Sequence, residues 1–138
     1  IGTCLVGSEM CIRDRALTQY IEAKLRISRD HPHASKVFAN EVMSGAKVLP
    51  EDIGQELFKQ SQMILDKFAT WSEEGLMDKV PAHHLMFTIW AATQTYADFS
   101  WQICNVMQKD TLDNDDYQQA AEFITQLVIK GCGVTGKA

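Results

Sequence analysis

The sequence predicts an all-α fold for a single domain of 138 residues. Beyond residue 15, apolar side chains recur every three or four positions, which is the period of a helix with one buried face. No stretch alternates apolar and polar residues for long enough to indicate a β-strand. Each of the 3 prolines stands where one of the periodic segments begins, and none interrupts a segment.

The first two predicted helices span residues 16–29 and 32–43. The first ends before Pro32, because proline disfavours helical backbone in the residue that precedes it. The same Pro32 suits the first turn of the second helix, and Gly45 ends that helix. The expected apolar stripes are Leu17, Ile21 and Leu25 in the first helix and Val37, Phe38 and Val42 in the second.

Three longer helices follow, at residues 50–74, 81–107 and 114–131. Asp113 or Asn114 is a suitable N-cap for the last of them. The middle one is apolar on more than one face, so we expect neighbours to cover it on several sides. The apolar stripes of the other two are Ile53, Leu57, Ile64, Phe68 and Trp71, and then Tyr117, Ala121, Ile124 and Val128.

Five helices joined by short turns predict a helical bundle. The last two helices carry more apolar surface than one domain needs, which predicts a homodimer held by a four-helix interface. We find no internal repeat or linker that would divide the chain further.

Composition excludes several classes of protein. The net charge is −5, from 13 basic and 18 acidic residues, and no basic cluster marks a surface for nucleic acid. No apolar run reaches the ~18 residues that a membrane span needs. Beyond residue 15 the cysteines are Cys104 and Cys132, which have neither disulfide-framework nor zinc-site spacing. We therefore expect reduced thiols and a cytoplasmic protein that does not contact membranes.

Residues 1–15 do not fit the pattern of the remaining chain. Residues 4–14 match the translation of a transposon-end adapter used to build sequencing libraries, and their apolar residues follow neither period. We expect residues 1–15 to be an unstructured artefact and the domain to span residues 16–138. Acidic and basic residues balance within residues 1–15, so the whole net charge belongs to residues 16–138.

Motifs for catalysis, cofactors and metals are missing. The sequence has no glycine-rich phosphate loop, no nucleophile elbow and no Glu-x-x-His pair of a di-metal bundle. His31 and His33 flank a proline, and the adjacent His83 and His84 point about 100° apart on a helix, so neither pair suits a metal. The sequence predicts no catalytic residue, no metal site and no cofactor.

Polar side chains on the fourth predicted helix form a candidate binding face. Trp90, Gln94 and Asp98 lie at i, i+4 and i+8 and share one face, which Thr93 adjoins. The Gln94 amide can both donate and accept, which matches an amide or imide edge, and the Trp90 ring offers a stacking surface. Alternatively, these polar groups pair with other helices inside the core.

Two further residues have two interpretations each. Glu41 falls on the core side of the second predicted helix, where a buried carboxylate must be paired or protonated. It would meet a ligand N–H or a cation such as Lys24 or Arg26, or it lies at a partly solvated position. Trp71 is either a core residue or a wall of a ligand site.

Three ordered segments resemble the effector domain of RutR-type regulators in the TetR family: residues 20–38, residues 40–46 followed by Leu49, and residues 84–99. The resemblance covers about residues 16–131. It implies a homodimeric bacterial repressor in which an N-terminal helix-turn-helix domain binds operator DNA and the C-terminal helices bind a small effector. Operator DNA is thus an expected partner only through the N-terminal domain, which residues 16–138 do not include.

The resemblance also implies an effector, a pyrimidine such as uracil or thymine, and its contacts. By position, Trp90 and Gln94 would contact the effector, with Thr93, Tyr96 and Glu41 as weaker candidates. The alternative function is a helical homodimerisation module without a ligand, which predicts a packed interior and a Gln94 bonded to protein groups. A pocket bounded by the first, third and fourth helices would favour the effector domain.

Overall fold

The computed structural model describes residues 9–133, and side chains from residue 13 onward. Within this part of the chain there are six α-helices and no β-strand, so the predicted all-α class is confirmed. None of these helices is long and apolar enough to cross a membrane. The helices are α1 (Glu9–Asp30), α2 (Pro32–Met43), α3 (Glu51–Glu73), α4 (Ala82–Asp98), α5 (Ser100–Met107) and α6 (Asn114–Gly131).

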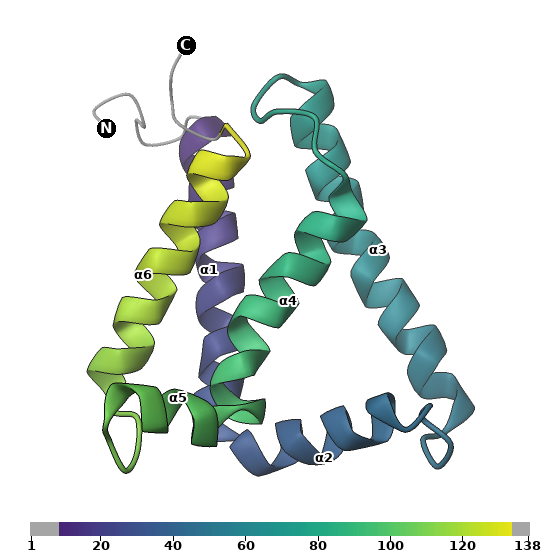
Figure 1. The fold of residues 1–138 in the computed structure, drawn as a ribbon. Coiled ribbons are helices and arrows are strands. Elements are labelled where there is room, and N and C mark those ends of the chain that lie inside the picture. The colour runs from purple at the N-terminus through teal and green to yellow at the C-terminus, as the bar shows by residue number, and fades with distance from the viewer. Residues whose placement is uncertain (1–8, 134–138) are drawn as a thin grey trace.

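Helix α1 is the centre of the packing. It lies along α6 on one side and α4 on the other, and these two contacts form most of the core (Figure 1). Leu65 and Phe68 of α3 also belong to it. The predicted α1 stripe is almost completely buried in it. Burial of a large aliphatic side chain stabilises a fold by about 1.5–3 kcal/mol. The core side chains include Leu17, Ile21 and Leu25 from α1, Met86 and Ile89 from α4, and Ala121, Ile124 and Val128 from α6.

Helices α2, α3 and α4 form a triangle beside this core. Helix α2 runs across the base, α3 rises along the outer side, and α4 closes the triangle against α1 (Figure 1). The turn from α2 to α3 begins at Gly45, whose φ of +93° suits glycine and ends α2 as predicted. The triangle is where the sequence placed its candidate binding face.

The first helix is longer than expected. It begins at Glu9 and not at residue 16, so residues 9–15, which we expected to be unstructured, are helical; residues 1–8 lie outside the described residues. The physical reason is propagation, since each added residue extends an existing helix by one hydrogen bond without a new nucleus. The adapter origin of this segment is untested and stays a prediction.

The extension places one charged side chain in the core. Arg13 precedes Leu17 by one turn and continues the buried stripe of α1, where its side chain is completely buried. Its Nη2 atom lies 3.3 Å from Asp14 Oδ1, while Nε and Nη1 have no hydrogen-bond partner among the described residues. A buried guanidinium that is only partly bonded is costly. Residue 13 therefore occupies a position that suits an apolar side chain better.

The predicted helix at 81–107 is two helices, and this corrects the expected number of five. Helix α4 ends at Asp98 and α5 begins at Ser100, with Phe99 between them at φ −119° and ψ 32°. No proline or glycine marks the break, and the apolar period runs through it unchanged. The sequence pattern therefore does not indicate a second helix. The break turns α5 across the lower end of the bundle, under α6 (Figure 1).

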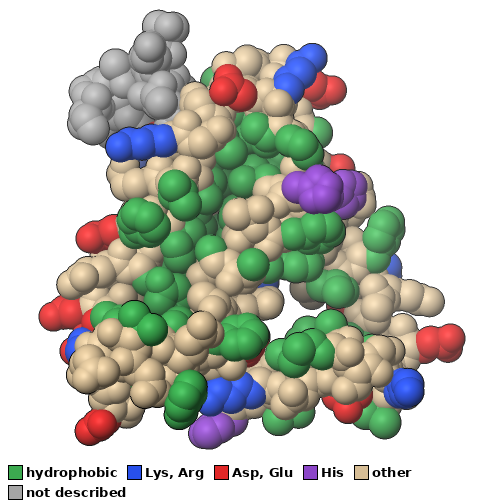
Figure 2. Space-filling model, viewed as in Figure 1, with side chains coloured by type: hydrophobic (Ala, Val, Ile, Leu, Met, Phe, Trp, Pro, Cys, Tyr) green, Lys and Arg blue, Asp and Glu red, His purple; other side chains and the backbone are tan. Residues whose placement is uncertain are grey.

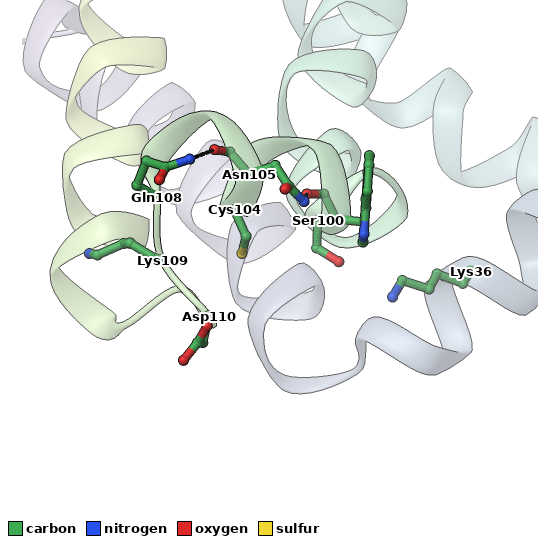
Figure 3. A pocket seen from close by; sticks show the side chains of 8 residues that line it. Lys36, Ser100, Cys104, Asn105, Gln108, Lys109 and Asp110 are labelled. Carbon is green, nitrogen blue, oxygen red and sulfur yellow. Dashed lines mark hydrogen bonds between the residues drawn. The ribbon is translucent and has the colours of Figure 1, made fainter.

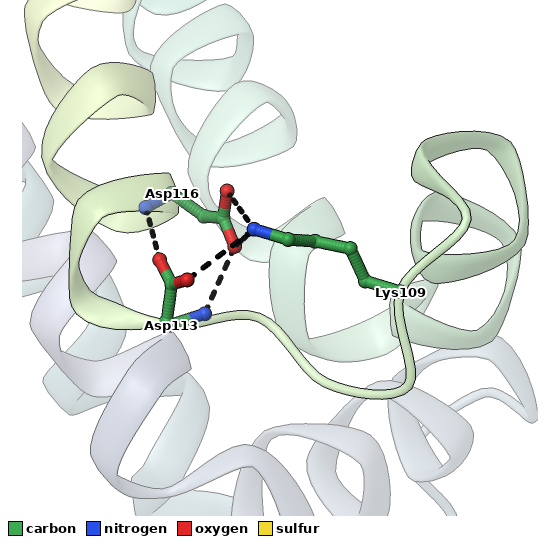
Figure 4. Close-up of polar contacts among 3 residues, drawn as sticks. All are labelled: Lys109, Asp113 and Asp116. Carbon is green, nitrogen blue, oxygen red and sulfur yellow. Dashed lines mark hydrogen bonds and ion pairs between the residues drawn. The ribbon is translucent and has the colours of Figure 1, made fainter.

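Helix α6 begins with a capping box (Figure 4). Of the two residues predicted as its N-cap, Asp113 occupies that position. Its Oδ1 accepts from Asp116 N at 3.0 Å, and its own N–H donates to Asp116 Oδ2 at 2.9 Å. Lys109 Nζ lies 2.6 Å from Asp116 Oδ2 and 3.3 Å from Asp113 Oδ2. The ammonium lowers the pKa of Asp116, and the two carboxylates raise the pKa of Lys109.

Replacing Arg13 with leucine should stabilise the chain. Arg13→Leu removes a buried charge and continues the apolar stripe, so the free energy of unfolding should rise by about 1–4 kcal/mol in a urea titration. Arg15→Leu is the matched control, because Arg15 is exposed on the same helix and its loss should change stability little. Equal effects of the two substitutions would show that burial of Arg13 has no energetic cost.

Removing the N-cap of α6 should destabilise the chain. Asp113→Ala deletes the acceptor for Asp116 N, and we expect a loss of about 1 kcal/mol in thermal unfolding followed by circular dichroism. Asp115→Ala makes the same change of charge in the first turn without removing the cap and should cost less. A larger loss from Asp115→Ala would contradict the capping role.

Candidate functional site

The triangle is open on its inner side. A cleft of about 520 Å³ lies between α2 and α4, and we call it the α2–α4 cleft. Its apolar lining includes Phe38, Val42 and Phe99, and its polar lining includes Gln94 and Asp98. Figure 2 shows an opening inside the triangle, with hydrophobic side chains along much of its rim. The α2–α4 cleft is therefore a largely apolar concave surface with a few polar groups, which is the usual form of a small-molecule site.

A second cleft of about 280 Å³ lies between α3 and α4, and we call it the α3–α4 cleft. Leu57 and Phe58 line it from α3, and Phe87 and Trp90 line it from α4. The Phe87 and Trp90 rings lie 5.7 Å apart between centroids, at an angle of 51°. This cleft provides flat apolar and aromatic surface.

Helix α2 explains why the α2–α4 cleft stays open. Its predicted apolar stripe does not enter the core, because Val37, Phe38 and Val42 are 65%, 43% and 50% exposed. None of the residues of α2 is buried. An apolar face at this exposure is costly in water, and a ligand in the cleft would cover the part of it that Phe38 and Val42 provide.

Gln94 is the predicted residue that enters the α2–α4 cleft. Its side chain is exposed, and its amide forms no hydrogen bond with another described residue. It does not pair across helices as the alternative interpretation requires. Both its donor and its acceptor are free for a ligand.

Trp90 lies one turn before Gln94 and has a polar partner. Its Nε1 donates to the Tyr20 hydroxyl on α1 at 2.8 Å. Lys24 Nζ lies 5.6 Å from the centroid of the Tyr20 ring and 5.7 Å from that of the Trp90 ring, a cation–π arrangement. Burial raises the pKa of Tyr20 against the opposing Trp90 hydrogen bond, and burial lowers the pKa of Lys24. Trp90 therefore offers a ring, and not its N–H, to the α3–α4 cleft.

The three weaker candidates line neither cleft. Thr93 is completely buried, and its hydroxyl donates to Ile89 O at 2.8 Å. Tyr96 is half-buried and packs against the core. Glu41 Oε2 accepts from Val48 N at 3.4 Å in the α2–α3 turn, so it does not face the core as expected. Thr93 and Tyr96 lie away from both clefts because successive residues turn by 100° about the helix axis. Glu41 does not enter the core because none of the residues of α2 is buried.

Asp98 enters the α2–α4 cleft, although helical periodicity predicts only that it shares a face with Trp90 and Gln94. Ser35 Oγ on α2 donates to Asp98 Oδ1 at 2.6 Å, which joins the two helices that form the cleft. Helical periodicity identifies the face of Asp98. It cannot identify Ser35, which lies 63 positions away in the chain.

The pocket expected between the first, third and fourth helices is small. A hollow of about 90 Å³ between α1 and α3 is lined by Tyr20, Phe68 and Trp71. Trp71 is half-buried and packs against the core, with its ring centroid 6.1 Å from that of Phe68. The larger open space lies instead on the α2 side of α4.

A different hollow of about 580 Å³ lies between the start of α2 and α5 (Figure 3). Its lining is polar, with Lys36 at one end and Lys109 at the other, and it contains none of the predicted site residues. Across the described residues, no group of three or more His, Cys, Asp or Glu side chains gathers to hold a metal ion. The α2–α4 cleft with the adjoining α3–α4 cleft is therefore the candidate site.

A family model described as "YcdC-like protein, C-terminal region" matches residues 13–135. The chain belongs to the TetR family, as a C-terminal domain of the RutR type. Two relatives named HTH-type transcriptional regulator RutR are 34% identical over 116 residues in Escherichia coli O157:H7 and 33% identical over 120 residues in Shigella flexneri. Each alignment covers 84% of this chain and 55% of the relative. The chain thus spans about half the length of these relatives, which are transcriptional regulators and not enzymes.

Proposed function

We propose that this domain senses a small pyrimidine such as uracil or thymine in the α2–α4 cleft. As a homodimer, it would use that binding to control an N-terminal helix-turn-helix domain on operator DNA. The observation that carries the proposal is the free amide of Gln94 in a largely apolar cleft. The name of the RutR relatives supports regulation of transcription.

The chemistry of the cleft suits a planar imide. The Gln94 amide donates to a ring carbonyl and accepts from a ring N–H, so it matches the edge of a pyrimidine that carries both groups. Phe38 and Val42 offer apolar surface to the ring faces, and the Trp90 ring lies one turn along α4. A few polar groups fix the orientation of the ligand while the apolar lining supplies contact area.

Contacts between α4 and α1 provide a route from the cleft to a preceding domain. Ser28 Oγ donates to Thr93 O at 2.9 Å, and Trp90 Nε1 donates to the Tyr20 hydroxyl at 2.8 Å, so a movement of α4 would be transmitted to α1. A domain that precedes α1 would change orientation with it. The effector shifts this equilibrium only if it binds one arrangement more tightly than the other, and two recognition helices must stay about 34 Å apart on DNA.

The alternative is a homodimerisation module without a ligand. The free Gln94 amide favours the sensor, since the alternative requires Gln94 to bond to protein groups. The hollow between α1 and α3 is small, as the packed interior of the alternative requires. Both functions need a dimer, and α6 offers a surface for it. Phe123 and Leu127, one turn apart, are 66% and 59% exposed.

Loss of the Gln94 amide should abolish pyrimidine binding without unfolding the chain. We expect Gln94→Ala to weaken uracil and thymine at least about tenfold in titration calorimetry, because both hydrogen bonds to the imide edge are lost. The control is Gln102→Ala, an exposed glutamine on α5 outside both clefts, which should bind as the parent chain does. Unchanged affinity in Gln94→Ala would remove Gln94 from the site. A folded parent chain that ignores millimolar uracil and thymine would exclude the pyrimidine.

A charge on the exposed face of α6 should separate the dimer. Leu127→Glu places a carboxylate in an apolar interface, so sedimentation equilibrium should show monomers where the parent chain forms dimers. Val48→Glu makes the same change at a residue that is 76% exposed in the α2–α3 turn, and it should leave the dimer intact. A monomeric parent chain, or a dimer that survives Leu127→Glu, would contradict an interface on α6.

A further inference from the structure

We propose that Asp98 determines the specificity of the effector site by accepting a ring N–H of the ligand. The inference rests on the proposed function and deepens it. It requires an effector that presents an N–H beside a carbonyl group, as cyclic imides and cyclic ureas do. Gln94 recognises such an edge in either orientation, whereas a carboxylate accepts only.

The position of Asp98 brings it to the same part of the cleft as Gln94. It follows Gln94 by one helical turn, so the Cβ atoms of the two residues lie about 5–6 Å apart on one face. Both side chains line the α2–α4 cleft. At this separation, the Gln94 amide oxygen and the Asp98 carboxylate can accept from two N–H groups on one edge of a six-membered ring. The Gln94 amide N–H then donates to the carbonyl between those two groups.

The carboxylate of Asp98 is only partly used by the protein. Ser35 Oγ donates to Oδ1 at 2.6 Å, whereas Oδ2 has no hydrogen-bond partner among the described residues. Lys36 also lines the cleft, but no ion pair joins its Nζ to Asp98 within the described part of the chain. One oxygen is thus held in place by α2, and the other is free to accept from a ligand.

The location of Asp98 also favours a ligand donor. It is the last residue of α4, at the junction with α5. Its side chain is partly buried beside the apolar Phe38 and Phe99, which reduces its contact with water. A ligand N–H directed at Oδ2 would replace the hydration lost there. The site therefore favours a ligand that presents an N–H donor over one that lacks it.

The test compares uracil with its N-methylated forms. Asp98→Asn keeps the size of the side chain and an acceptor for Ser35 Oγ, but it presents an N–H₂ group to the ligand N–H. In titration calorimetry we expect the affinity for uracil to fall at least about tenfold. The parent chain should bind uracil more tightly than the methylated form, 1-methyluracil or 3-methyluracil, in which a methyl group replaces the ring N–H that Asp98 accepts. Asp98→Asn should lose this preference.

Two matched variants separate ligand contact from a structural role. Ser35→Ala breaks the bond between α2 and α4 but leaves the carboxylate, so it should keep the preference for N–H donors. Asp110→Asn makes the same chemical change outside the α2–α4 cleft and should bind uracil as the parent chain does. Circular dichroism verifies that each variant is folded.

The outcomes are distinct. If Asp98→Asn binds uracil as tightly as the parent chain, or keeps the full preference over both methylated forms, the role of Asp98 is overturned. If Asp98→Asn and Ser35→Ala lose the same affinity for uracil and both keep the preference for N–H donors, the role is also overturned. Asp98 would then only connect α4 to α2 through its hydrogen bond with Ser35. If the folded parent chain binds neither uracil nor thymine, the proposed function itself fails, and a selectivity for its ligand fails with it.

Discussion

The structure depends on the burial of one helix between two others. Leu17, Ile21 and Leu25 on α1 are 1%, 0% and 2% exposed, because α4 and α6 cover them from two sides. Each such side chain contributes about 1.5–3 kcal/mol by leaving water. Since α1, α4 and α6 bury one another's apolar side chains, α2 and most of α3 are not needed to complete the core. That division leaves an apolar cleft beside a stable bundle.

Polar contacts then hold the cleft in register with the core. Three side-chain hydrogen bonds of the described residues join segments far apart in sequence: Trp90 to Tyr20, Ser28 to Thr93 O, and Ser35 to Asp98. All three involve α4, so this helix carries both the site and its connections. Because α4 is the shared wall of both clefts, a ligand that touches it acts on the same element that contacts α1.

Much of the fold could be predicted from local sequence, because helix period and end signals are local. Gly45 and Asp113 end and begin helices as expected. The break at Phe99 and the burial of Arg13 could not, since no proline or glycine marks the first and the second follows from continued helix growth. Gln94 was found because periodicity gives its face. Ser35 was not, because only tertiary packing brings α2 to α4.

The exposure of α2 links stability to the proposed sensing. Val37, Phe38 and Val42 keep the predicted period, yet their stripe covers no core, so α2 gains little from its present position. Its attachment to α4 across the cleft includes the Ser35 hydrogen bond, and one such bond contributes only about 0.5–1.5 kcal/mol net, or up to about 3 with a charged acceptor. A ligand that contacts both α2 and α4 therefore has to overcome only the small free energy that holds α2 against α4. Weak intrinsic attachment of α2 is what would allow a molecule as small as a pyrimidine to change the position of the helices around it.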